Sequence, residues 1–232
     1  MAGTRSRRTR AAAKKPASGA AADKHARKAA RSDAVRNRRR EELVAATIKC
    51  IARSGMGGVT MQEVTREAGL SLGIVNLHFD TKEKLLVETL RAIADEYRAG
   101  WRRILDSARP AATRLAALVD FDFSARVVDR GKLAVWFAFW GETKARPTYR
   151  RICAEVDRTI DDELCRLCTE LVADGRYRGV DPKRVATTYS ALTNGLWLDL
   201  LVCPEAIDRR AARAICLDYF AGMFPAHFER IA

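Results

Sequence analysis

The stretch TMQEVTREAGLSLGIVNLHF, residues 60–79, decides which fold is expected for the N-terminal part of this chain. Thr60 and Glu63 have the spacing of a capping box, in which two side chains satisfy backbone amides at the start of a helix. Gly69 suits a turn with positive φ, and Ser71 suits the cap of a second, short helix. Two helices joined by a tight turn form a helix-turn-helix, whose second helix can enter the major groove of DNA.

Apolar residues recur at three- and four-residue spacings on both sides of this motif, as in amphipathic helices. One helix is expected from Arg36 to Ser54, and no long segment alternates with the period of a strand. Further helices are expected at residues 81–107, 112–129, 132–145, 147–174, 182–202 and 205–224. The predicted fold class is therefore all-α. A three-helix DNA-binding head, residues 34–80, precedes a helical ligand-sensing and dimerisation bundle, residues 81–232.

Positive charge is concentrated at the N-terminus. Residues 1–40 hold 14 Lys and Arg against two Asp, so 12 of the 13 net positive charges lie there. Residues 1–33 also lack the large apolar side chains that offset ordering entropy, which predicts a disordered basic tail. DNA phosphates are its expected partner, through counterion release. The alternatives are a solvated extension without a partner and an organellar transit peptide, which the Arg- and Ala-rich composition superficially resembles.

A tail that binds phosphates should influence both the strength and the salt dependence of DNA binding. Deleting residues 1–32 is expected to weaken binding and to flatten the plot of log affinity against log salt, by about 0.9 per lost phosphate contact. Titrations of one DNA fragment over a salt series measure this slope for both chain lengths. An unchanged slope would mean that the tail is a bystander.

The motif and the residues after it resemble the DNA-binding signature of the TetR family of bacterial transcriptional regulators. The matching residues are Thr60, Val64, Glu67, Ala68, Gly69, Leu70, Ser71, Gly73, Phe79, Lys82 and Leu85. The resemblance implies a DNA-binding head on a helical, homodimeric body, in which a bound small molecule moves the two heads apart. The chain departs from the family at residues 76–79, where Asn-Leu-His-Phe replaces the frequent Tyr-His-Tyr-Phe.

The same resemblance implies which residues contact double-stranded operator DNA. Phosphate contacts are expected from Thr60, Ser71, His78 and Lys82, and base contacts from Leu72, Gly73, Asn76 and Leu77. An Asn side chain can pair with an adenine edge, and glycine permits close approach to the bases. For His78, the alternative is a half-buried helix residue without a role in DNA binding.

Two later stretches, LAVWFAFWGETKARPTY at residues 133–149 and ALTNGLWL at residues 191–198, resemble the C-terminal domain of the BetI-type subgroup. That subgroup contains choline-responsive repressors of betaine synthesis and regulators of other pathways. Together with the head, the resemblance covers about residues 38–228. The chain departs from the subgroup at Asn194, where members often have Asp.

Aromatic residues of the bundle are candidates for a ligand site. Trp136 and Trp140 are four residues apart and so share one helix face. Residues that could complete a cage with them are Phe123, Tyr189 and Trp197, with Asp120, Asp122 or Glu142 supplying negative charge. Aromatic faces attract quaternary ammonium groups, so choline or a related cation is the expected effector. The alternatives are that these aromatics are packed core, and that the effector of another TetR-type operon is uncharged or apolar.

The last two expected helices carry more apolar residues than one core face needs. The apolar residues of these two helices include Leu192, Leu196, Leu200, Leu201, Ile215, Leu217, Phe220 and Phe224. Two copies of this helix pair would form a four-helix interface, so the sequence predicts a homodimer.

Other classes of function have less support. His25, His78 and His227 lie far apart and no phosphate-binding glycine loop is present, so neither an enzyme nor a bound cofactor or metal is expected. Cys165 and Cys168 are spaced like a redox or metal pair, but without a second pair they are better explained as packed thiols. A non-specific nucleoid-binding protein is the remaining alternative. No apolar run is long enough to span a bilayer, so a cytoplasmic, nucleoid-associated bacterial protein without membrane contact is expected.

Overall fold

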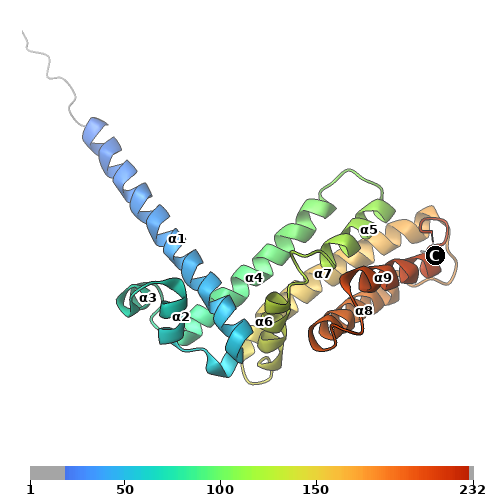
Figure 1. The fold of residues 1–232 in the computed structure, drawn as a ribbon. Coiled ribbons are helices and arrows are strands. Elements are labelled where there is room, and N and C mark those ends of the chain that lie inside the picture. The colour runs from blue at the N-terminus through green and yellow to red at the C-terminus, as the bar shows by residue number, and fades with distance from the viewer. Residues whose placement is uncertain (1–18, 230–232) are drawn as a thin grey trace, which may run out of the picture. The chain divides into compact units, whose positions relative to one another are not determined.

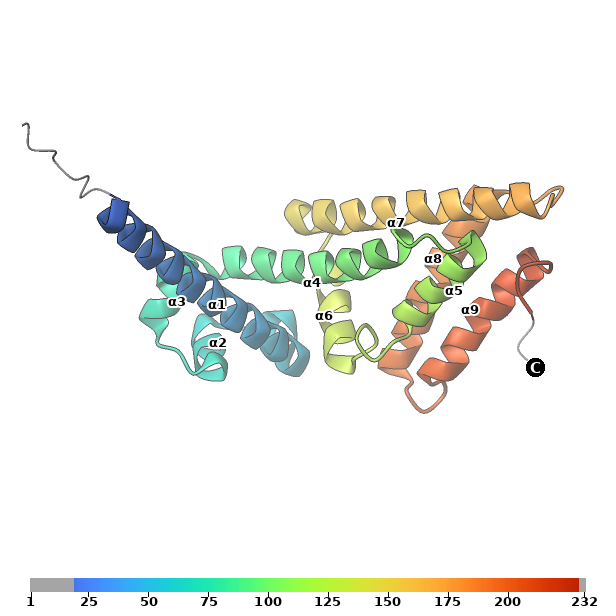
Figure 2. The ribbon, with the colours of Figure 1, turned by 90° about the horizontal axis from the view of Figure 1, so that it is seen from above.

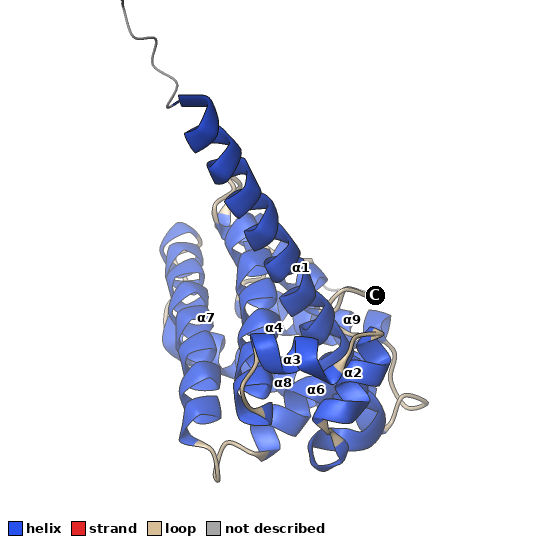
Figure 3. Cartoon of the chain, turned by 90° about the vertical axis from the view of Figure 1, so that its left-hand side faces the viewer, coloured by secondary structure: helices blue, strands red, loops and turns tan. Residues whose placement is uncertain are grey.

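A computed structural model of the chain describes residues 19–229. Within that range the regular structure consists of nine α-helices and no strand, which confirms the predicted all-α class (Figure 3). The chain forms two compact units, residues 1–41 and residues 42–232, and each is described by itself.

The first unit is helical where the structure describes it. Residues 19–41 form the N-terminal part of α1 (Gly19–Gly58), so residues 19–33 are helical where the sequence predicted disorder. Residues 1–18 of the predicted tail lie outside the described residues. Ala, Lys and Arg are strong helix formers, and extending a helix that is already nucleated costs little. The prediction of disorder relied on the lack of large apolar side chains and did not take this helix propensity into account.

The second unit begins with the three helices of the head. The C-terminal part of α1 is followed by α2 (Met61–Ala68) and α3 (Leu72–His78). At Gly55, φ is 67° and ψ is 176°, which interrupts the helix one residue after its predicted end. Leu43, Val64, Val75 and Phe79 are buried and hold the three helices together.

Six helices follow: α4 (Lys82–Leu105), α5 (Ala111–Asp122), α6 (Arg130–Gly141), α7 (Pro147–Asp174), α8 (Pro182–Val202) and α9 (Arg209–Met223). α4 and α7 run side by side, and α8 packs against both α7 and α9 (Figures 1 and 2). None of the described helices is both long enough and apolar enough to cross a membrane.

After α1, three helix boundaries differ from the predicted ones by four residues or more. α5 ends at Asp122 instead of residue 129, α6 ends at Gly141 instead of 145, and α9 begins at Arg209 instead of 205. Capping side chains set the starts of α6 and α9. Asp129 accepts a hydrogen bond from the Lys132 amide before α6, and Asp208 accepts one from the Ala211 amide before α9. Capping side chains outweighed the apolar periodicity on which the predictions relied.

Two hydrophobic clusters fill the second unit. The bundle core joins α4, α5, α7, α8 and α9 and includes Leu118, Leu167, Tyr189 and Phe220. The head core joins the three head helices to α4, α6 and the start of α7; it includes Leu43, Val64, Val75, Phe79, Leu85, Val135, Trp136, Phe139, Tyr149 and Ile152. The head is therefore packed directly onto α6, and the boundary expected at residue 80 stays a prediction.

Candidate functional site

The entry to α2 is a capping box. The Thr60 hydroxyl accepts a hydrogen bond from the Glu63 amide at 3.1 Å, and the Thr60 amide donates to Glu63 Oε2 at 3.0 Å. Gly69 ends the helix with φ at 65°, in the left-handed region that favours glycine. The predicted capping box and turn are both confirmed, and together they fix the angle at which α3 leaves α2.

α3 buries one face and exposes the other. Val75 is completely buried in the head core, whereas the side chain of Leu77 is 72% exposed and that of Leu72 is 43% exposed. Asn76 and Gly73 are also exposed. The four residues predicted to contact bases thus lie on the accessible surface of the helix.

The four residues predicted to contact phosphates differ in their hydrogen bonds and in their exposure. The hydroxyl of Ser71 makes no capping hydrogen bond although the residue precedes α3, whereas the hydroxyl of Thr60 also lies 3.3 Å from Glu63 Oε2. A phosphate contact from Thr60 would therefore compete with the capping box. His78 and Lys82 are half-buried.

Gly73 is not required by the fold of the head. A Cβ added there would meet only Ser71 Oγ, at 3.9 Å, which is ordinary van der Waals contact. Because a glycine inside a helix is destabilising relative to alanine, its presence at this exposed site needs another explanation. Close approach to a ligand surface is one such explanation.

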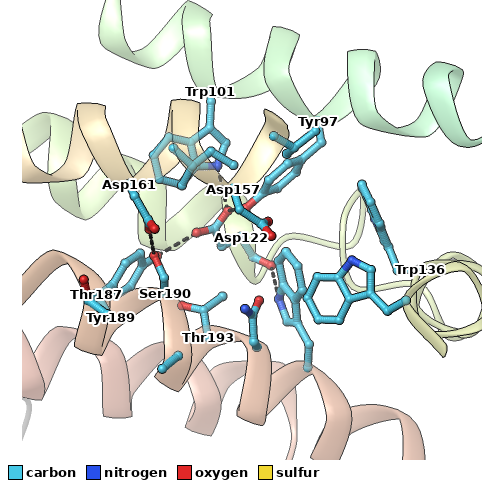
Figure 4. Close-up of a pocket in the computed structure, with 16 residues that line it drawn as sticks. Tyr97, Trp101, Asp122, Trp136, Asp157, Asp161, Thr187, Tyr189, Ser190 and Thr193 are labelled. Carbon is cyan, nitrogen blue, oxygen red and sulfur yellow. Dashed lines mark hydrogen bonds between the residues drawn. The ribbon is translucent and has the colours of Figure 1, made fainter. Parts of the chain in front are cut away.

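The bundle contains a cavity of about 250 Å³ between α4, α5, α6, α7 and α8 (Figure 4). Aromatic rings from three helices line it: Tyr97, Trp101, Trp136, Trp140, Tyr189 and Trp197. The Tyr97 ring centroid lies 5.7 Å from that of Trp197 and 6.3 Å from that of Trp136. The volume equals that of roughly eight liquid waters, which suits a small organic molecule.

Asp122 organises these rings. Its Oδ1 accepts hydrogen bonds from Tyr97 at 2.8 Å and from Trp101 Nε1 at 3.0 Å, and its Oδ2 accepts one from Tyr189 at 2.7 Å. Its backbone carbonyl accepts a fourth from Trp197 Nε1 at 3.0 Å. Burial raises the pKa of Asp122 to about 6, although the three side-chain hydrogen bonds act in the opposite direction. At neutral pH the cavity wall therefore contains a carboxylate bonded only to neutral donors.

Two further carboxylates, both on α7, line the cavity. Asp157 and Asp161 are one helical turn apart, and Ser190 Oγ donates to Asp161 Oδ1 at 2.7 Å (Figure 4). Desolvation and the charge of Asp161 raise the pKa of Asp157 to about 6. Asp157 is exposed as a residue, so partial desolvation of its carboxyl group acts together with the nearby charge of Asp161.

Several residues predicted for the ligand site lie elsewhere. Asp120 is exposed and pairs with Arg213, at 2.5 Å between Oδ1 and Nε, because it lies on the outer face of α5. Phe123 is buried in the bundle core and does not line the cavity. Glu142 accepts a hydrogen bond from Arg146 Nε at 3.1 Å, also outside the cavity. Of the predicted ligand residues, the cavity brings together Asp122, Trp136, Trp140, Tyr189 and Trp197.

The cavity and the head share structural elements. Trp136 lines the cavity and also belongs to the head core. After α6, Arg146 forms an ion pair with Glu83 in the first turn of α4, and the Tyr149 hydroxyl donates to Glu83 Oε2 at 3.3 Å. A molecule that displaces α6 would therefore act on the helix that follows α3.

Comparison with known proteins gives matches to both parts of the chain. The model of the N-terminal region of bacterial regulatory proteins of the tetR family matches residues 43–89, and that of the C-terminal region of BetI-type transcriptional repressors matches residues 110–225. The HTH-type transcriptional regulator BetI of Burkholderia mallei is 31% identical over 186 residues, which are 80% of this chain and 93% of that protein. The chain belongs to the TetR family. Within it, this protein is a BetI-type transcriptional repressor, and so a regulator instead of an enzyme.

Further relatives of this TetR-family repressor agree with its fold. BetI of Ectopseudomonas mendocina is 32% identical over 188 residues, 78% of this chain and 91% of that one. A solved transcriptional regulator from Pseudomonas aeruginosa PAO1 has a TM-score of 0.72 at 30% identity, covering 82% of this chain and 93% of its own. One from Saccharomonospora viridis, in complex with choline, has a TM-score of 0.71 at 23% identity, covering 78% and 94%.

Sequence reasoning missed several residues that line the cavity of this BetI-type repressor, among them Tyr97, Trp101, Asp157 and Asp161. A signal was present for the last two. They are acidic residues four apart on a helix whose neighbouring turns carry Val156 and Ile160. Carboxylates beside an apolar helix stripe are costly unless the site is functional, which marks such residues as candidates.

Proposed function

We propose that a small quaternary ammonium cation, such as choline, binds in the cavity and changes the affinity of the repressor for its operator. The observation that carries this proposal is Asp122. It is buried, four aromatic residues donate hydrogen bonds to it, and the donors to its carboxylate are the neutral groups of Tyr97, Trp101 and Tyr189. The structure thus holds negative charge inside an aromatic wall, which complements an ammonium group that cannot donate hydrogen bonds.

The comparisons add support of a more general kind. Curated relatives carry the name BetI, and a solved neighbour with the same fold holds choline. The alternative of an uncharged, apolar effector is favoured by the many rings and by the size of the cavity. The two proposals differ in whether the effector needs a positive charge.

Calorimetry with a matched pair of ligands tests the need for charge. 3,3-Dimethyl-1-butanol has the shape of choline with carbon in place of nitrogen, so it probes the aromatic walls without the charge. We expect choline to bind at least about tenfold more tightly, in line with cation–π and carboxylate attraction in a partly desolvated site. Equal binding of the two would favour the apolar effector, and failure of both to bind at millimolar concentration would reject the cavity as the effector site.

Acid should weaken choline binding. The pKa of both Asp122 and Asp157 is raised to about 6, so both carboxylates lose their charge as the pH falls through that value. Each carboxylate that the cation requires ionised lowers the affinity by about tenfold per pH unit below its pKa. Titrations between about pH 5 and pH 8 are expected to show constant affinity at the upper end and a decline below about 6. Constant affinity over the whole range would contradict a role for these carboxylates.

We also propose that α3 reads operator DNA through its exposed face, with Leu72, Gly73, Asn76 and Leu77 toward the bases. Phosphate contacts are assigned to Ser71, Thr60, His78 and Lys82. The exposure of the first four residues and the orientation fixed by Gly69 support this assignment. An exposed Leu side chain on a recognition helix suits contact with a thymine methyl group.

Gly73→Ala separates stability from DNA binding. The added Cβ has room in the free protein, and alanine in a helix is favoured over glycine by up to about 1 kcal/mol, so the variant is expected to be at least as stable as the wild type. If DNA approaches this position closely, operator affinity falls by roughly tenfold or more. Thermal unfolding and operator titration measure the two effects. Unchanged operator affinity would place Gly73 away from the bases.

We propose a homodimer formed by α8 and α9. Most residues of the predicted apolar surplus fill the protomer's own core, among them Leu196, Leu217 and Phe220. The exposed apolar residues of these helices are Leu198, Val202 and Ile215, at 44%, 63% and 41% exposure. They continue along stripes of small residues that include Gly195 and Gly222, where a Cβ would meet nothing. Two such helix pairs can form a four-helix interface.

A further inference from the structure

The cavity is lined by acidic groups of two different kinds. Asp122 lies among the rings with three donors already bound to its carboxylate. Asp157, on α7, accepts no hydrogen bond from any residue between 19 and 229, and no cation within that range pairs with it or with Asp161. Two carboxylates one helical turn apart without a counterion repel each other, which is a cost to the free protein. Such a cost is offset when a cation binds.

A third polar group points to an occupant of the same cavity. Thr193 on α8 is 4% exposed, and its Oγ1 has no oxygen or nitrogen partner within residues 19–229. Its polar neighbour is the thiol of Cys216, which is only a weak hydrogen-bonding group. Thr193 lines the cavity beside Tyr189 and Ser190 (Figure 4). Buried hydroxyl groups are normally paired, so a bound molecule that offers a donor or acceptor here would satisfy it.

The aromatic rings and the α7 carboxylates therefore suit different chemical groups. A quaternary ammonium carries no N–H and is held by ring faces, as at Trp136, Trp140 and Trp197. Asp157 and Asp161 are acceptors, and they are best matched by a group that is both charged and a hydrogen-bond donor, such as a primary ammonium. The two kinds of surface occupy one continuous cavity.

We propose that the cavity is a site for dications, with a quaternary ammonium among the rings beside Asp122 and a primary ammonium on Asp157 and Asp161. This inference rests on the proposed function, because it places the first cation in the same aromatic wall. It goes further in that the effector carries two positive charges at opposite ends of a short chain.

Calorimetry of the full-length protein at about pH 7.5 tests the second charge. The probes are (3-aminopropyl)trimethylammonium, a dication, and (3-hydroxypropyl)trimethylammonium, a monocation of the same length. The wild type is expected to bind the dication roughly tenfold more tightly. Asp157→Asn and Asp161→Asn should each reduce that preference, because each removes a carboxylate that pairs with the second charge.

Asp162→Asn is the matched control, because Asp162 is exposed on the same helix and does not line the cavity. It should keep the full preference for the dication, and monocation binding by each variant reports that the cavity is folded. A wild type that binds both probes equally, or a preference that survives both Asp157→Asn and Asp161→Asn, would overturn the second subsite and leave the proposed function standing. Failure of both probes and of choline to bind would instead reject the proposed function.

Discussion

Asp122→Asn is expected to raise the Kd for choline at least about 100-fold while the protein remains folded. The substitution removes the one charge that lies inside the aromatic wall and keeps nearly the same shape. An amide oxygen in place of Oδ1 still accepts from Tyr97 and Trp101, but an NH₂ group in place of Oδ2 cannot accept from the hydroxyl of Tyr189. Calorimetry measures the affinity, and thermal unfolding verifies the fold.

Two opposing contributions determine the unfolding free energy of this variant: the cost of a buried charge and the hydrogen bonds to it. Because the pKa of Asp122 is raised from 3.8 to about 6, keeping it ionised at pH 7 costs the folded state a few kcal/mol. Asparagine removes that cost and loses hydrogen bonds of about 1 kcal/mol each, so the net change in unfolding free energy is small. Asp122→Ala instead leaves several buried donors without an acceptor and is expected to destabilise the protein by roughly 2–5 kcal/mol.

Asp120→Asn provides a matched control two residues away. Asp120 loses the same charge, but it lies on the exposed side of α5 in an ion pair with Arg213. We expect its choline affinity to equal that of the wild type. If Asp120→Asn weakened choline binding as much as Asp122→Asn does, overall charge would explain the effect and the aromatic site would not.

Leu198→Arg combined with Ile215→Arg is expected to convert the protein to a monomer and to lower operator affinity at least about 100-fold. Both positions are exposed in the single chain, so arginine fits without disturbing the core. Two arginines from each copy would be brought together in an apolar interface, where unpaired charges are costly. A dimer places two heads on one operator, and losing the second head removes its contribution to binding.

Light scattering and operator titration measure the two effects. Ala173→Arg adds the same kind of side chain at an exposed position of α7 and should leave both the dimer and the operator affinity unchanged. A double variant that remains dimeric would place the interface on another surface. A wild type that is already monomeric at micromolar concentration would reject the proposed homodimer.

The head could be predicted almost completely because its signals are local. The capping box of Thr60 and Glu63 and the turn at Gly69 depend only on residues within a few positions of each other, and the structure confirms both. For the N-terminal tail, the prediction of disorder was wrong between residues 19 and 33. Residues 19–33 are helical because helix propensity and extension of α1 suffice.

The cavity could be predicted only in part because it is formed by five helices. Trp136, Trp140 and Trp197 were found from their types and spacing, and all three line the cavity. Asp120, Asp122 and Glu142 were all candidates for the negative charge, because only tertiary packing buries Asp122 and leaves Asp120 exposed. Tyr97 and Asp157 belong to α4 and α7, whose proximity to α8 is a matter of tertiary packing that no local pattern encodes.

The coupling between cavity and head is the central claim, and operator binding with and without effector tests it most directly. An operator fragment selected from genomic DNA by the purified protein is labelled, and its binding is followed by fluorescence anisotropy. Saturating choline is expected to shift the wild-type midpoint by about tenfold or more and to leave Asp122→Asn unchanged. A wild-type midpoint that stays the same, while calorimetry shows choline bound, would contradict the account.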